Sequence, residues 1–271
     1  LDDVALHLAD DMFTVAGKLA AASDVLVDEI QHHLYFAAVR AQRFYNTDST
    51  QRVYDAVERF LTSAGDGCAF ILHGRSGTGK TFLLSKTAIE HMRGSIECGR
   101  NVVVRYLGTT PASSTVHALL TSLCDQLRRC YCKKDPVPET YVAIKKYFHQ
   151  ALKDWPNPEQ PLTLFLDSVD QLDDSNEGRS LDWLPVIGLS PHVRLVVSTL
   201  PDQAEFQCLS QLCTHLGSRG SIMEVETISD HRKVMLHLLR AQNRRITDAQ
   251  MNAIDAAFKG RTDADAAGTP L

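Results

Sequence analysis

One segment limits what this chain of 271 residues can fold into more than any other feature. Residues 74–81 read GRSGTGKT and match the pattern G-x-x-x-x-G-K-[S/T] at every fixed position. A short apolar run at 68–72 precedes the segment, and a helical pattern that begins at Phe82 follows it. A buried strand, a glycine-rich loop and a helix in this order form the context in which the pattern binds phosphate. The segment therefore predicts a phosphate-binding loop in an α/β fold.

The residue types in this loop suit a triphosphate, which needs many hydrogen-bond donors at close range. Gly77 and Gly79 allow backbone conformations that a side chain would oppose, so N–H groups can point inward while the next helix directs its positive end at the phosphates. We expect Lys80 to carry its charge to the β- and γ-phosphates in a catalytic role, and the Thr81 hydroxyl to ligate Mg²⁺. The residues predicted to hold nucleotide here are Gly74, Arg75, Ser76, Gly77, Thr78, Gly79, Lys80, Thr81 and Phe82.

Short apolar runs alternate with helical patterns through the middle of the chain. After the run at 68–72, runs typical of strands buried on both faces lie at 102–107, 162–166, 195–199 and 222–225. Helical patterns separate them at about 80–93, 114–131, 138–153 and 202–215. This alternation predicts βαβ units with right-handed crossovers, and therefore a three-layer α/β/α fold around a parallel sheet of five strands.

Both ends of the chain show helical periodicity. Near the N-terminus, one helix is expected from about Val25 towards Arg40, and another after a cap at Ser49 and Thr50. From about Ser229 the pattern is helical again. We therefore divide the chain into a helical lead or linker at 1–48, a P-loop NTPase core at 49–226 and the truncated start of a helical domain at 227–271.

Polar side chains follow two of the predicted strands. The run at 162–166 ends at Asp167, where open α/β sheets place their ligands, so we assign Asp167 to Mg²⁺ through a bound water. Asp170 lies three residues further on, and we expect it to polarise the attacking water or to complete the metal shell. Ser198 and Thr199 end the next strand and would face the γ-phosphate if that strand lies between the other two. The alternative for both is an ordinary strand end.

Composition excludes several classes of function. The net charge of −5 and the pI near 6.1 argue against a dedicated nucleic-acid binder, which usually carries a basic face. No apolar run approaches the ~20 residues that span a bilayer, and we expect no signal peptide. Seven cysteines at irregular spacing indicate reduced thiols in a cytoplasmic protein. The guanine-reading pattern N-K-x-D does not occur in the sequence, which favours ATP over GTP.

With these residues in place, the chain resembles the NACHT-domain NTPases of the STAND class, and in particular those that carry WD repeats. The similarity includes the Walker A segment at 71–81 and the Walker B segment at 165–170, which has a small residue after Asp167 and a second acid at Asp170. It also includes the stretches at 107–111 and 119–124, the sensor 1 region at 197–201 and a G-x-P segment at 268–271.

This resemblance implies a sheet order of 5-1-4-3-2 and an adenine contact at Pro270. It implies a nucleotide-controlled switch in signal transduction, closed with ADP, and open and oligomeric with ATP. Self-association or protein partners would act through regions outside this chain, with no nucleic acid and no membrane. Two departures point to slow hydrolysis: Gln171 stands where many NACHT domains have Glu, and Leu200 where many have Arg.

Three hypotheses for function follow from these features. The first is a regulatory ATPase switch that binds ATP or ADP with Mg²⁺ and turns over slowly. The second is a small-molecule kinase or other transferase, which shares the loop and the metal carboxylate but needs a basic lid and an acceptor pocket. The third is a scaffold that does not hydrolyse nucleotide. The intact Lys80, Thr81 and Asp167 favour the first.

Overall fold

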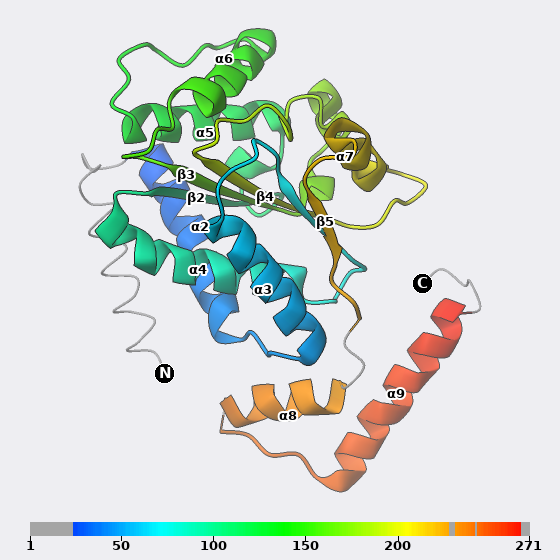
Figure 1. Cartoon of the computed structure of the whole chain (residues 1–271). Helices are drawn as coiled ribbons and strands as arrows, with labels where there is room; N and C mark the ends of the chain where they lie inside the picture. The colour runs from blue at the N-terminus through cyan, green and yellow to red at the C-terminus, as the bar shows by residue number, and fades with distance from the viewer. Residues whose placement is uncertain (1–23, 228–230, 242, 267–271) are drawn as a thin grey trace. The chain divides into compact units, whose positions relative to one another are not determined.

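The computed structural model describes residues 24–227, 231–241 and 243–266 (Figure 1). The chain divides into two compact units, Leu1–Thr227 and Ile228–Leu271. In the first unit, five strands form one sheet in the order β2-β3-β4-β1-β5, and every neighbouring pair is parallel. Read from the other edge, this is the order 5-1-4-3-2 that the family resemblance implies. The strands are β1 (Phe70–His73), β2 (Asn101–Tyr106), β3 (Leu162–Asp167), β4 (Val193–Thr199) and β5 (Ser221–Glu224).

Helices cover both faces of this sheet, which confirms the three-layer α/β/α fold (Figure 1). The helices of the first unit are α2 (Val25–Gln42), α3 (Asp48–Thr62), α4 (Lys80–Cys98), α5 (Val116–Cys130), α6 (Tyr141–Asp154) and α7 (Cys208–Leu216). Alternate residues of a strand point to opposite faces. On β3, Leu164 accordingly joins the core beneath α5 and α6, whereas Phe165 joins the core beneath α2, α3 and α4. No helix in the described part of the chain is long and apolar enough to cross a membrane.

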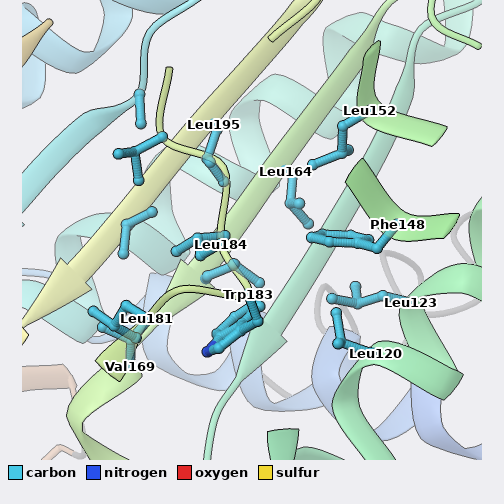
Figure 2. Close-up of a cluster of buried hydrophobic side chains, with 14 of the residues drawn as sticks. Leu120, Leu123, Phe148, Leu152, Leu164, Val169, Leu181, Trp183, Leu184 and Leu195 are labelled. Carbon is cyan, nitrogen blue, oxygen red and sulfur yellow. The ribbon is translucent and has the colours of Figure 1, made fainter. Parts of the chain in front are cut away.

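An irregular segment, residues 175–190, supplies much of the core on the α5 and α6 face. It begins with a short 3-10 helix, η3 (Ser175–Ser180), and continues without regular structure. Figure 2 shows Trp183 from this segment among Phe148 of α6, Leu164 of β3 and Leu184. The indole N–H of Trp183 donates to the carbonyl oxygen of Gly178 at 2.9 Å, so its polar atom is satisfied within the core.

The strand at the edge of the sheet corrects one expectation. The run at 222–225 was expected to form a strand buried on both faces, but Ile222 is 43% exposed. The physical reason is that β5 pairs only with β1, so one side of the strand lacks a neighbour. Two helices also begin later than their patterns predict. Helix α6 starts at Tyr141, after Pro138, and α7 starts at Cys208, after a turn that pairs Gln203 with Phe206.

The second unit contains two described helices, α8 (His231–Ala241) and α9 (Asp248–Ala266). An ion pair of 3.8 Å joins Arg232 of α8 to Asp255 of α9, and Met251 is buried. Both helices agree with the helical periodicity expected after Ser229. The helical pattern predicted at the extreme N-terminus lies outside the described residues.

Candidate nucleotide-binding site

The predicted phosphate loop joins the end of β1 to the start of α4. Gly79 caps the helix with φ of 93°, and Gly77 has φ of 81°, so both occupy the left-handed region that favours glycine. Gly74 is required for a different reason: a Cβ there would lie 2.4 Å from the carbonyl oxygen of Val225, which follows β5. The glycines thus shape a loop whose backbone leads directly into a helix N-terminus.

Lys80 is the first residue of α4, and its side chain is buried in the loop. Its ammonium group donates to the carbonyl oxygens of Gly74 at 2.5 Å and Arg75 at 3.0 Å. Burial lowers the pKa of this ammonium group, while the charges of Asp167 and Asp170 act in the opposite direction. The cation therefore lies among backbone oxygens at the same edge of the sheet as the two carboxylates.

Asp167 ends β3, and its side chain is buried at the same edge of the sheet. The Ser198 hydroxyl, from the neighbouring strand β4, donates to this carboxylate, and the Thr81 hydroxyl of α4 acts to lower the pKa of the same group. Burial nevertheless raises the pKa of Asp167 above its ordinary value, against the opposing effects of these two hydroxyls and of Lys80. A buried carboxylate that is incompletely compensated and stands beside a hydroxyl offers the oxygen ligands that Mg²⁺ prefers. The side chains at this position therefore fit a magnesium ion.

The prediction that β4 lies between β1 and β3 is confirmed, and it explains where Ser198 and Thr199 sit. The Ser198 hydroxyl both donates to Asp167 and accepts from the backbone N–H of Ser168 at 2.8 Å, so it positions the carboxylate in this structure. The Thr199 hydroxyl is buried and has no hydrogen-bond partner among the described residues.

Asp170 lies in a short 3-10 helix, η2 (Val169–Gln171), directly after the metal carboxylate. One of its carboxylate oxygens accepts from the backbone N–H of Leu200 at 2.9 Å, and the other accepts from the side-chain amide of Gln171 at 2.7 Å. Asp170 thereby ties the turn after β3 to the residue that follows β4. Both of its oxygens are occupied by hydrogen bonds.

The remaining predicted residues are distributed unevenly. Arg75 and Ser76 lie exposed on the loop, while Thr78 is buried and its hydroxyl donates to the carbonyl oxygen of Arg75 at 3.0 Å. Phe82, one residue beyond Thr81, is 36% exposed. Pro270 lies outside the described residues. The structure therefore brings Lys80, Thr81, Asp167, Asp170 and Ser198 together at one edge of the sheet, with the loop beside them.

A pair of polar groups that the sequence did not point to supports this edge. Tyr106 ends β2 opposite Asp167 in the strand register, and its hydroxyl lies 2.7 Å from the Ser85 hydroxyl of α4. Ser85 stands one helical turn after Thr81, so the pair links β2 to the helix that begins the phosphate loop. Twenty-one positions separate the two residues, and no local pattern connects them.

A parallel sheet in this strand order, with its glycine-rich loop after β1 and its acidic residue at the end of β3, defines a P-loop NTPase of the nucleotide-binding class. The family model of the NACHT domain matches residues 69–241, which is more than half of the chain. The chain belongs to the NACHT domain family.

Two human proteins are similar to this chain in sequence. NACHT and WD repeat domain-containing protein 2 is 29% identical over 256 residues, which cover 90% of this chain and 14% of the human protein. NACHT domain- and WD repeat-containing protein 1 is 29% identical over 227 residues, which cover 81% of this chain and 14% of that protein. The chain thus spans about a seventh of the length of these relatives.

Solved structures with a similar arrangement of elements include two replication initiation proteins. Domain III of DnaA from Thermotoga maritima is 13% identical, with a TM-score of 0.47, and the match covers 85% of this chain and 90% of that one. DnaA from Aquifex aeolicus bound to AMPPCP is 15% identical, with a TM-score of 0.45, and the match covers 79% of this chain and 58% of that one.

Proposed function

We propose that this chain binds ATP or ADP with Mg²⁺ and acts as a nucleotide-controlled regulatory module that hydrolyses ATP slowly. The observation that carries this proposal is the convergence of the Lys80 ammonium group, the Thr81 hydroxyl and the buried Asp167 carboxylate at the end of one glycine-rich loop. A cation, a hydroxyl and a carboxylate beside a helix N-terminus are the groups that a magnesium triphosphate needs.

Each group has a distinct part in binding. The backbone N–H groups of the loop and of the first turn of α4 would hold the phosphate oxygens. The Lys80 ammonium group, which now contacts the carbonyl oxygens of Gly74 and Arg75, would turn towards the β- and γ-phosphates. Bound Mg²⁺ would neutralise charge on the phosphates, and Thr81 and Asp167 are the residues that would hold it. Ser198 fixes the direction of the Asp167 carboxylate by donating to it.

Slow hydrolysis is supported by the contacts of Asp170. Hydrolysis adds water to the γ-phosphorus, releases ADP and phosphate, and leaves a proton that a base must take up. The Asp170 carboxylate already accepts hydrogen bonds from Leu200 and Gln171, one on each oxygen. These hydrogen bonds compete with the attacking water for the oxygens that would take up its proton. Gln171, next in the chain, can orient a water but cannot accept its proton. Turnover would therefore be low even when nucleotide is bound.

The regulatory role rests on the family to which the chain belongs. We propose that exchange of ADP for ATP shifts the shape of the module and favours self-association, with protein partners bound through regions outside this chain. Six cysteines are free, and three of them, Cys68, Cys124 and Cys208, are buried; the other three are Cys130, Cys132 and Cys213. Free thiols of this kind agree with a cytoplasmic location.

The test is calorimetric titration of the purified chain, in Mg²⁺, with ADP, with a non-hydrolysable ATP analogue and with GDP. We expect saturable binding of both adenine nucleotides and weaker binding of GDP. Turnover of ATP is then followed by phosphate release, and assembly by light scattering with each adenine nucleotide. Failure of the chain to bind any nucleotide under these conditions would overturn the proposal.

Replacing Asp167 with asparagine should weaken binding in Mg²⁺ much more than binding in EDTA. The amide keeps the shape of the carboxylate and is neutral, so it removes the metal ligand without creating a cavity. We expect affinity for ATP to fall about tenfold or more in Mg²⁺, and to change little without it. Calorimetric titration of both proteins in both buffers measures this difference. An equal loss in the two buffers would assign Asp167 a purely structural role.

Replacing Asp170 with asparagine should lower turnover while the affinity for ATP stays nearly constant. Asp170 lies after the metal carboxylate and hydrogen-bonds to the residue after β4, whereas its carboxylate has no hydrogen bond to the described residues of the phosphate loop. Loss of a general base or of a residue that orients water typically costs about 100-fold in rate. Phosphate release at saturating ATP is the measurement. Turnover equal to that of the unmodified protein would remove Asp170 from the reaction.

A further inference from the structure

An aromatic stack leads from α2 to the metal-binding end of the site. The guanidinium carbon of Arg40, in the last turn of α2, lies 3.1 Å from the centroid of the Phe36 ring. The Phe36 ring in turn lies 4.4 Å from the ring of Tyr106. Tyr106 pairs with Asp167 in the parallel register of β2 and β3. Arg40 is therefore held on a platform that ends beside the carboxylate assigned to Mg²⁺.

The charge of Arg40 acts on this end of the site. Burial lowers the pKa of the Arg40 guanidinium, and the charge of Asp167 works against that lowering. Arg40 likewise opposes the rise in the pKa of the Tyr106 hydroxyl that burial causes, and Asp167 adds to that rise. Tyr106 thus lies within the electrostatic reach of both a cation from α2 and the carboxylate from β3.

Among the residues that the structure describes, Arg40 has no anionic partner. It is half-buried, and among the described residues no carboxylate lies within ion-pair distance of its guanidinium group. Its neighbour Arg43 adds a second positive charge that lowers the pKa of Arg40 further. A cation near the C-terminus of a helix is favourable, and this accounts for the exposed Arg43. The helix C-terminus also favours Arg40, and the Phe36 ring offsets part of the cost of its burial, but neither supplies an anion for the N–H donors of the guanidinium group.

We propose that Arg40 is a specificity-determining residue that favours a nucleoside triphosphate over a diphosphate by binding the terminal phosphate. This inference rests on the proposed function. The terminal phosphate is the anion that fits, because the stack from Arg40 through Phe36 to Tyr106 ends beside Asp167, which would hold Mg²⁺ together with the phosphates of a triphosphate. Lys80 and Mg²⁺ would neutralise charge in both nucleotides. Arg40 would bind the additional negative charge that a triphosphate carries and a diphosphate lacks.

The proposal makes α2 part of the nucleotide site, although α2 precedes the segment that matches the family model. Helix α2 is joined to the core by polar contacts as well as by apolar ones. His33 of α2 accepts from the backbone N–H of Tyr106 at 3.2 Å, and its other ring nitrogen bonds Glu29 at 2.8 Å. Glu29 also accepts from the Thr110 hydroxyl at 2.7 Å. These contacts fix the position from which Arg40 reaches towards the phosphates.

The experiment compares four variants of the full chain by calorimetric titration in Mg²⁺ with ADP and with the β,γ-methylene analogue of ATP. Arg40→Met keeps the aliphatic stem on Phe36 and removes the charge, whereas Arg40→Lys keeps the charge and loses the planar fork. Arg43→Met is the matched control, because Arg43 lies on the same end of α2 but is exposed. Lys80→Ala reports on the site as a whole.

We expect Arg40→Met to weaken binding of the triphosphate analogue about tenfold or more, since a charge-assisted hydrogen bond is lost, and to change ADP affinity by less than about twofold. The affinity of Arg40→Lys for the triphosphate analogue should lie between those of the original chain and Arg40→Met. Arg43→Met should keep the original ratio of triphosphate to diphosphate affinity. If Arg40→Met proves unfolded by circular dichroism, the ratio of affinities in Arg40→Lys tests the inference instead. Lysine keeps the cation at the end of the helix but lacks the planar guanidinium group that can donate two hydrogen bonds to one phosphate.

Two results would overturn the inference alone: an unchanged ratio of affinities in the Arg40 variant, or an equal loss for both nucleotides. In both cases the original protein binds and Lys80→Ala does not, so the proposed function survives. If the original chain and Lys80→Ala bind both nucleotides equally, or neither binds, the site assignment fails and the role of Arg40 fails with it.

Discussion

Replacing Lys80 with alanine is expected to abolish detectable binding of ATP and ADP while leaving the fold intact. The ammonium group would contact two phosphates, and each charge-assisted hydrogen bond contributes about 1.5–3 kcal/mol, so the loss amounts to about 100-fold or more in affinity. Stability should not fall, because Lys80 has no carboxylate partner among its hydrogen bonds and its burial already lowers the pKa of the ammonium group. Calorimetric titration measures affinity, and circular dichroism follows thermal unfolding.

Lys86→Ala is the matched control for this experiment. Lys86 lies on the same helix, and its ammonium group pairs with Glu90 at 2.8 Å, away from the phosphate loop. The Lys86 side chain is 35% exposed, and exposed ion pairs of this kind contribute little to stability. We expect its nucleotide affinity to equal that of the original chain. Micromolar affinity in Lys80→Ala would disprove the assignment of the loop.

The central strands of the sheet could be predicted because each of them has a recognisable local sequence pattern. Each central strand is a short apolar run between polar turns, which is the pattern of a strand buried on both faces. Strand β3 fits this pattern fully, because every one of its residues is buried. The same rule misled at β5, since apolar content does not tell an edge strand from a central one. Edge position depends on which strands pair, and pairing is a long-range property of the chain.

The groups at the site divide in the same way. The loop and Asp167 follow from a motif and from its position at a strand end, so the sequence alone placed them. The contact of Ser198 with Asp167, thirty-one positions away, follows only from the insertion of β4 between β1 and β3. Arg40 was less visible still, because an arginine near the end of an amphipathic helix resembles any solvated helix cation until its burial is seen.

The segment at 175–190 was the largest feature that the sequence left unassigned. It carries no helical or alternating pattern, yet it buries Leu181, Trp183 and Val186 against the sheet. Irregular chain usually lies on the surface because its backbone groups need partners. Here some of those partners come from side chains: the Nε2 atom of His149 donates to the carbonyl oxygen of Trp183 at 2.8 Å, and the indole of Trp183 donates to Gly178.

Replacing Trp183 with alanine should therefore destabilise the module severely. The side chain is fully buried, and its ring lies 6.4 Å from that of Phe148, so truncation removes a large apolar contact surface and leaves a cavity. Substitutions of this kind lower the free energy of unfolding by about 3–5 kcal/mol. Loss of the hydrogen bond to Gly178 adds an unpaired buried carbonyl. Urea denaturation followed by circular dichroism measures the change without relying on the fluorescence of the deleted indole.

Trp155→Ala tests whether this cost belongs to the position or merely to the loss of a tryptophan. Trp155 follows α6 and is only half-buried, between Tyr131 and Tyr147, with Lys133 over its ring. At a half-buried site, solvent and neighbouring side chains can fill the space that the deleted ring leaves. We therefore expect Trp155→Ala to lower the free energy of unfolding clearly less than Trp183→Ala. Trp183 and Val169, the first residue of the turn that carries Asp170, belong to the same buried cluster (Figure 2). A milder variant, Trp183→Phe, should therefore stay folded and reduce ATP turnover more than ATP affinity. If Trp183→Ala and Trp155→Ala lower the free energy of unfolding equally, residues 175–190 do not support the core more than a half-buried surface residue does.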